Sequence, residues 1–222
     1  MFLCYCVVES EADVRAPGRG VAGAEVRELH ADGVRCFYSP WEPQKMPTEA
    51  ALEFQRLISS VFAQAQTVPF RFGHPVATEE DLRSFIAQHA AAYRRALQYF
   101  RGLAQMDAAL TFTPPAGETT SGREYLDRIR ERRAALREAV TALRRGVCAR
   151  AWKESEQQEK LRCYALIELD AAAEFRDQML RVNLPKTLRA LVSGPWPPAE
   201  FMKLNEAPLA AVEAVRLEEG PR

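Results

Sequence analysis

Gly194-Pro195-Trp196-Pro197-Pro198 is the most constrained stretch of the sequence, because it places three prolines within four positions. Each proline ring fixes its own φ at about −65° and disfavours helical backbone in the residue before it. We therefore expect Gly194, Trp196 and Pro197 to be extended and to hold the indole on a short, stiff segment. Residues 188–193, just before it, are apolar and partly alternating, which indicates a strand. Because proline cannot donate a ladder hydrogen bond, this strand is expected at a sheet edge.

The segments before this strand predict an α+β domain. Apolar periodicity gives strands at residues 108–113, 148–155, 161–169 and 188–193, and helices that start after Ser121 and after Asp170. Ser121 with Glu124 forms a capping box, and Asp170 is expected to be the N-cap of the second helix. The order strand, helix, strand, strand, helix, strand is the ferredoxin-like (βαββαβ) order.

The N-terminal half predicts a mixed α+β domain. Strands are expected at residues 2–8, 24–30 and 34–38, a turn at 31–33, a helix that ends near Gln66, and a second helix that begins at the Thr78 and Asp81 capping box. We therefore expect an α+β fold of two domains. They are an N-terminal α+β domain over residues 1–105 and a ferredoxin-like domain over 106–203, followed by a tail over 204–222 with a short helix.

Three motifs stand out along the chain: Pro69-Phe-Arg-Phe-Gly73, Ser121-Gly-Arg-Glu-Tyr-Leu126 and Ser193-Gly-Pro-Trp-Pro-Pro-Ala-Glu-Phe201. They occur in the order found in the gas vesicle protein L/F (GvpL/GvpF) family, which the sequence resembles over nearly its whole length. The resemblance implies an accessory or minor structural protein that binds the hydrophobic gas vesicle shell protein and supports vesicle assembly. It implies other gas vesicle accessory proteins as further partners, and the gas vesicle as the location.

Composition excludes several classes of partner. Thirty Lys+Arg balance thirty Asp+Glu in 222 residues, so no net charge attracts nucleic acid or an anionic membrane. No apolar run approaches the roughly 20 residues that span a bilayer, and Met1-Phe2-Leu3 lacks the basic start of a signal peptide. We expect the chain to stay in the cytoplasm.

Residues with reactive side chains form no recognisable catalytic pattern. The sequence has no glycine-rich phosphate loop or nucleophile elbow, and His30, His74 and His89 lie in separate segments. Five cysteines form no disulfide framework, which favours thiols in a reducing compartment. Cys4 and Cys6 are expected on one face of a strand, but no further metal ligands lie near them. We expect no catalytic residue, no metal and no cofactor.

The candidate partner-binding residues are Trp196, Pro197, Pro198, Phe201 and Arg71. A rigid aromatic loses little entropy when a partner binds it, although Trp196 can equally fill an interface between the two domains. The alternation of Phe70, Arg71 and Phe72 predicts that both phenylalanines point one way. Arg71 then either contacts a partner or forms an ordinary ion pair. His89 lies on an apolar stripe, which favours a hydrogen-bonded core histidine over a ligand or base.

The helix after Ser121 is locally basic, with eight arginines from Arg123 to Arg145 and only four acidic residues. Its polar face either receives an acidic partner or nucleic acid, or is a solvated face with pairs such as Glu124 with Arg128 and Asp127 with Arg130. No aromatic residues alternate with the arginines to stack on bases.

Two other functions stay open from the residues alone. One is a ferredoxin-like module that binds a small ligand or regulates a process unrelated to vesicles. The other is a small enzyme without a cofactor. A copurifying small molecule, or one that raises the melting temperature, favours the first of these.

Overall fold

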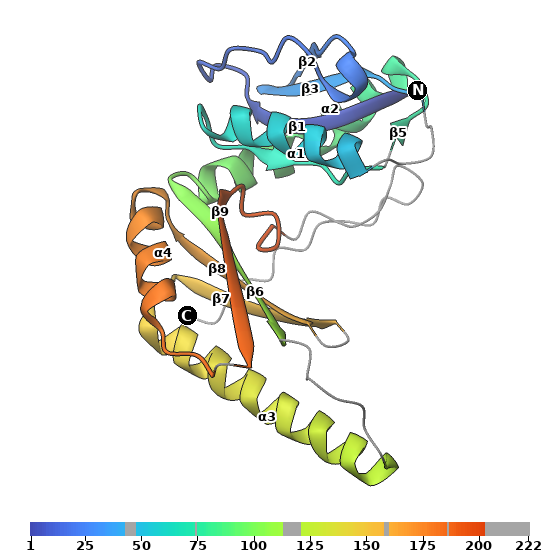
Figure 1. Ribbon diagram of the computed structural model, residues 1–222. Helices are drawn as coiled ribbons and strands as arrows, with labels where there is room; N and C mark the ends of the chain where they lie inside the picture. The colour runs from blue at the N-terminus through green and yellow to red at the C-terminus, as the bar shows by residue number, and fades with distance from the viewer. Residues whose placement is uncertain (43–47, 74, 113–120, 158–159, 186, 203–222) are drawn as a thin grey trace. The chain divides into compact units, whose positions relative to one another are not determined.

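The computed structural model describes residues 1–42, 48–73, 75–112, 121–157, 160–185 and 187–202 (Figure 1). The chain forms two compact units. The first is Met1–Arg101 together with the segment that starts at Trp196, and the second is Gly102–Pro195. The expected domain limits of 1–105 and 106–203 stay a prediction. The expected tail, 204–222, lies outside the described residues.

The first unit is built on an antiparallel sheet with the strand order β2-β3-β1-β4, in which β5 also pairs with β1. Its elements are β1 (Phe2–Glu9), η1 (Val21–Gly23), β2 (Arg27–Ala31), β3 (Val34–Pro40), α1 (Thr48–Phe62), β4 (Val68–Pro69), β5 (Pro75–Val76) and α2 (Glu79–Tyr99). The hairpin between β2 and β3 is confirmed. Its turn residues, Asp32 at φ 46° and Gly33 at φ 82°, take the positive φ that a tight hairpin turn requires.

Both faces of this sheet are covered, because β1 is buried along its length from Leu3 to Val8. Helix α1 packs on one face against Leu3, Tyr5 and Phe37. Helix α2 lies on the other face, where its Tyr93 is close to Cys4 and Cys36 (Figure 1).

The expectation that Cys4 and Cys6 share a face is wrong. Cys4 pairs with Tyr38 and Cys6 pairs with Phe37, so the register shifts between the two cysteines at a β-bulge. A bulge adds one residue and reverses the alternation of side chains beyond it. Cys6 therefore joins the core beneath α1, and Cys4 faces α2.

The second unit has the strand order β7-β8-β6-β9. Its elements are β6 (Leu103–Phe112), α3 (Gly122–Gly146), β7 (Ala151–Gln157), β8 (Lys160–Glu168), η2 (Leu169–Ala171), α4 (Ala172–Arg181) and β9 (Leu188–Trp196). The predicted order of strands and helices is confirmed. Alternate residues of β6 and β8 pack against both α3 and α4, so the two helices cover the same face (Figure 1). The shared core contains Met106, Leu110, Leu143, Cys163, Ile167 and Phe175.

Two local predictions in this unit are wrong. Asp170 does not cap α4, because it lies inside the 3-10 turn η2, and the N-cap position belongs to Ala171, which makes no side-chain capping bond. The last strand does not end at Ser193 but continues to Trp196. It lies at the edge of the sheet, as the prolines predicted.

Candidate interaction surface

The end of β9 is fixed by Gly194, which has φ +121° and precedes a cis peptide bond to Pro195. Gly194 is therefore not extended in the way that its position before proline predicted. A Cβ atom at this position would lie 2.7 Å from Met106 Sδ and 2.8 Å from the backbone oxygen of Gln105. Arg176 Nη2 of α4 donates a hydrogen bond of 2.5 Å to the Gly194 oxygen. The strand thus passes so close to β6 that only glycine fits.

Four of the predicted docking residues, Trp196, Pro197, Pro198 and Phe201, lie at the end of β9 and in the compact turn that follows it. The Pro198 oxygen accepts hydrogen bonds from Phe201 N at 3.0 Å and from Met202 N at 3.1 Å. Pro197 and Pro198 are buried, whereas Trp196 and Phe201 are half-buried and each has interaction partners. Exposed aromatic surface on this turn therefore comes from Trp196 and Phe201. We call residues 196–202 the β9 turn.

Arg71 belongs to a different loop, the one that follows β4. Its side chain is exposed and has an interaction partner. The two neighbouring rings do not point the same way. The Phe70 ring centroid lies 6.1 Å from that of Tyr93 in α2, and the Phe72 ring centroid lies 5.2 Å from that of Phe54 in α1. The predicted alternation fails because β4 ends at Pro69, so these residues are not in a strand.

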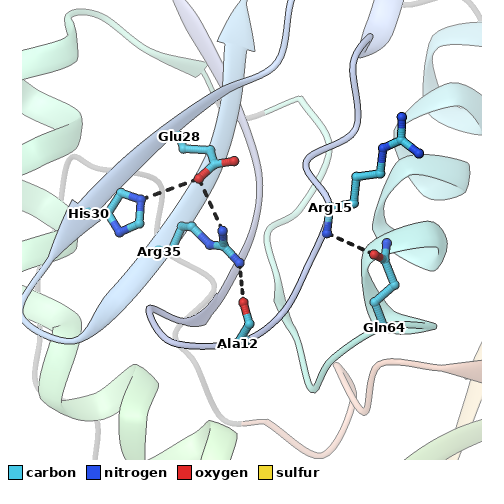
Figure 2. A network of polar contacts seen from close by, with 6 residues as sticks. All are labelled: Ala12, Arg15, Glu28, His30, Arg35 and Gln64. Carbon is cyan, nitrogen blue, oxygen red and sulfur yellow. Dashed lines mark hydrogen bonds and ion pairs between the residues drawn. The ribbon is translucent and has the colours of Figure 1, made fainter.

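A cluster of polar residues in the first unit anchors its long N-terminal loop (Figure 2). Arg35 Nη1 of β3 lies 3.3 Å from Glu28 Oε2, and its Nη2 donates a 2.7 Å hydrogen bond to the Ala12 oxygen. His30 Nε2 lies 3.4 Å from the same Glu28 oxygen. The Arg35 side chain is only 11% exposed and stacks on the Phe37 ring, which suits a structural ion pair. This cluster ties the loop to the sheet.

His89 and the buried thiols also have structural roles. His89 Nδ1 is 2.8 Å from the Phe85 oxygen, and its ring stacks on Phe85 at 4.4 Å. Burial raises the pKa of Cys163 to about 12 and raises the pKa of Cys6 still further, so both thiols are protonated at neutral pH. Within the described ranges, no three His, Cys, Asp or Glu side chains are arranged to hold a metal ion. No helix among them is long and apolar enough to cross a membrane.

The basic helix α3 is partly covered. The predicted pair of Asp127 with Arg130 is confirmed at 3.4 Å, and Arg133 lies 3.9 Å from Glu156 of β7. Sequence reasoning missed Arg176 as the donor to β9. It also missed Tyr5, whose hydroxyl accepts a hydrogen bond from Val21 N and so anchors the N-terminal loop. No local pattern marks either residue, because both partners come from distant segments.

The sequence matches the family described as "Gas vesicle synthesis protein GvpL/GvpF" over residues 2–203. The chain belongs to this family. A search of curated protein sequences finds no match. Among solved structures, the chain resembles that of the gas vesicle protein GvpF from Anabaena sp. PCC7120, with a TM-score of 0.72 and 14% identity over 92% of this chain and 96% of that chain.

A second GvpF structure, from Microcystis aeruginosa, is similar with a TM-score of 0.69 and 14% identity, over 91% of this chain and 99% of that one. At this identity the likeness concerns the fold alone. The GvpL/GvpF sequence match and the mixed α+β fold with two antiparallel sheets thus agree with each other.

Proposed function

We propose that this chain is an accessory or minor structural protein of gas vesicles that binds the hydrophobic shell protein and supports vesicle assembly. The observation that carries the proposal is the GvpL/GvpF family match over residues 2–203. The role is non-catalytic, located at the gas vesicle in the cytoplasm, and other gas vesicle accessory proteins are further partners. In this proposal the second unit is a ferredoxin-like scaffold, which agrees with its strand order β7-β8-β6-β9.

The proposed docking surface is the β9 turn, with Arg71 as a second contact. Two buried prolines and the hydrogen bonds to the Pro198 oxygen restrict this turn, and the half-buried Trp196 and Phe201 present aromatic surface on it. A pre-organised aromatic group adds affinity because little conformational entropy is lost on binding. Arg71 lies in a different loop, where its side chain is exposed, and in this proposal it adds a polar contact to the partner.

The test is retention of the purified chain on immobilised shell protein. We expect saturable retention by the wild type and about a tenfold or larger loss for Trp196→Ala, as for the removal of an aromatic binding hot spot. Tyr99→Ala is the matched control, because Tyr99 is 74% exposed on α2. This variant should bind like the wild type.

The melting temperature separates docking from a structural role of Trp196. If Trp196→Ala lowers the melting temperature strongly, the indole fills the protein interior and the docking surface lies elsewhere. If the wild type shows no saturable retention, the proposed function itself is wrong.

A further inference from the structure

Helix α3 is packed against the sheet only in its C-terminal half. Its core residues are Leu136, Ala139, Val140 and Leu143. In residues 122–134, every described side chain is exposed or half-buried. At 1.5 Å per residue this part is about 20 Å long, and Figure 1 shows it running past the ends of the strands. We call residues 122–134 the α3 arm.

The apolar stripe of the helix continues along the arm. Ile129, Leu136 and Leu143 recur every seven residues, so they lie on one side of the helix, and Leu126 lies one turn before Ile129. The sheet stops covering this stripe near Arg132 and Arg133. There the Arg132 guanidinium lies 5.2 Å from the Phe112 ring centroid at the end of β6, and Arg133 reaches Glu156 of β7.

Beyond that point the stripe is partly open to solvent. Leu126 is 55% exposed and Ile129 is half-buried. Leu126 and Ile129 together leave apolar area on the arm that the sheet does not cover, and a partner helix laid along the arm would cover both.

A ladder of arginines runs along one side of this stripe. Arg123, Arg130, Arg137 and Arg144 recur every seven residues, and all four are exposed. Residues seven apart lie almost directly above one another on a helix, so the four charges form one row. Neither Arg137 nor Arg144 has an acidic residue three or four positions away on its own helix. Arg123 and Arg130, in contrast, both lie within one turn of Asp127, and Arg130 is 3.4 Å from it. The positive charge that the helix itself does not balance therefore lies at Arg137 and Arg144.

We propose that the α3 arm binds an acidic amphipathic helix of another protein. The apolar side of that helix covers Leu126 and Ile129, and its acidic side chains pair with the arginine ladder. An amphipathic helix laid against an apolar stripe, with charges at its flanks, is a common mode of peptide recognition. This surface is separate from the β9 turn, and it serves a partner in addition to the proposed shell protein.

The charges of the arm favour a helix over a nucleic acid or an anionic membrane. Glu124, Glu131 and Glu138 form a second row with the same spacing, about 100° further round the helix and on the side away from Ile129. A partner on the apolar stripe therefore meets a narrow row of arginines and not the broad basic face that suits phosphate groups. A protein helix can instead place acidic residues only opposite the arginines, and it also covers the apolar stripe, which phosphates do not.

The test uses the full chain and two synthetic amphipathic helical peptides as probes. Both carry the same leucine stripe, which is flanked by glutamates in one peptide and by lysines in the other. By fluorescence anisotropy we expect the glutamate peptide to bind about tenfold or more tightly than the lysine peptide. This preference should shrink as the ionic strength rises, since the charges are exposed.

Two sets of variants locate the binding surface. Arg123→Glu/Arg130→Glu/Arg137→Glu should reverse the preference, and Leu126→Ser should weaken the binding of both peptides. Arg56→Glu/Arg95→Glu/Arg145→Glu is the control, because it changes the net charge equally at exposed positions outside the ladder. It should behave like the wild type, and circular dichroism checks that each variant is folded.

Equal affinity for the two peptides overturns the proposal, as does a ladder variant that binds like the control. It is also overturned if duplex RNA or anionic vesicles bind the ladder more tightly than the glutamate peptide does. The proposed function is tested separately, because retention on the shell protein should be unchanged in the ladder variant.

Discussion

Gly194 is the residue on which the close approach of β9 to β6 depends. Gly194→Ala would add a Cβ atom 2.8 Å from the backbone oxygen of Gln105, and backbone cannot move aside as the end of a flexible side chain can. It would also place alanine at φ +121°, a conformation that residues with a Cβ rarely adopt. We expect a loss of about 2–4 kcal/mol in the free energy of unfolding from strain and overpacking together. Urea denaturation of the full chain measures it.

Gly18→Ala is the control for this substitution, because nothing lies within 4 Å of a Cβ atom built at Gly18. Its unfolding midpoint should match that of the wild type or exceed it slightly, since alanine restricts the unfolded chain. Equal midpoints for the two variants would mean that β9 can move away from β6 at little cost.

Single residues were predicted well where the chemistry is local and poorly where it depends on distant segments. The capping roles of Thr78 and Ser121 follow from the residue three positions on, and both are confirmed. Tyr5, in contrast, bonds Ser39 Oγ at 2.7 Å and accepts a hydrogen bond of 2.9 Å from Val21 N. Neither partner is a neighbour in sequence, so no local pattern could have indicated the bonds.

The start of α2 shows how much one capping residue contributes to an element. Thr78 Oγ1 accepts a hydrogen bond of 3.1 Å from the backbone N–H of Asp81, and the same hydroxyl lies 2.6 Å from Asp81 Oδ2. We expect Thr78→Ala to lower the free energy of unfolding by about 1 kcal/mol, because it leaves an N–H of the first turn without its partner. Thermal denaturation followed by circular dichroism measures the change.

Ser84→Ala is the matched control, because Ser84 is an exposed residue inside the same helix. This variant should be at least as stable as the wild type, since alanine has the higher helix propensity. A Thr78→Ala protein as stable as Ser84→Ala would show that tertiary packing alone fixes the start of α2.

Elements were predicted from periodicity, and their ends were the weaker part of the prediction. The predicted strands and helices occur in the predicted order. The errors come from geometry that a pattern cannot carry: a bulge between Cys4 and Cys6, a 3-10 turn around Asp170, and a strand that continues through Pro195. Proline is compatible with that strand because its missing N–H lies on a sheet edge.

At the scale of the whole molecule, the two units bury their sheets differently. The first unit covers both faces of its sheet, whereas both helices of the second unit pack on the same face. Periodicity predicted the elements of each unit, but not that the segment from Trp196 groups with the first one. The family was predicted from the three motifs, and it matches over residues 2–203. Among the residues that the structure describes, no arrangement of reactive side chains indicates a function. The candidate surface stays a prediction for the same reason.

The first unit buries several thiol and phenol groups in their neutral form, and for this reason the free energy of unfolding should decrease at alkaline pH. Burial raises the pKa values of Cys6, Cys36 and Tyr93 in the first unit. In the second unit it raises the pKa of Cys163 from its usual 9.0 to about 12. Folding thus keeps these groups protonated, whereas the unfolded chain ionises its thiols near pH 9. The stabilisation is fully present below that pH.

We therefore expect the free energy of unfolding to be flat up to about pH 8.5 and to fall continuously as the pH rises from 9 toward 12, because only the unfolded chain then releases the protons. Urea denaturation at a series of pH values tests the sign of this pH dependence.

Reaction with a thiol reagent at pH 8 provides the independent readout, since Cys148 is exposed and the other four thiols are buried. One thiol should react at once and the rest only at the rate of unfolding, while Cys148→Ser should lose the fast phase and keep the pH profile. Stability that rises above pH 9 would contradict the raised pKa values. Rapid reaction of all five thiols would mean that the buried cysteines of both units are not sealed in their cores.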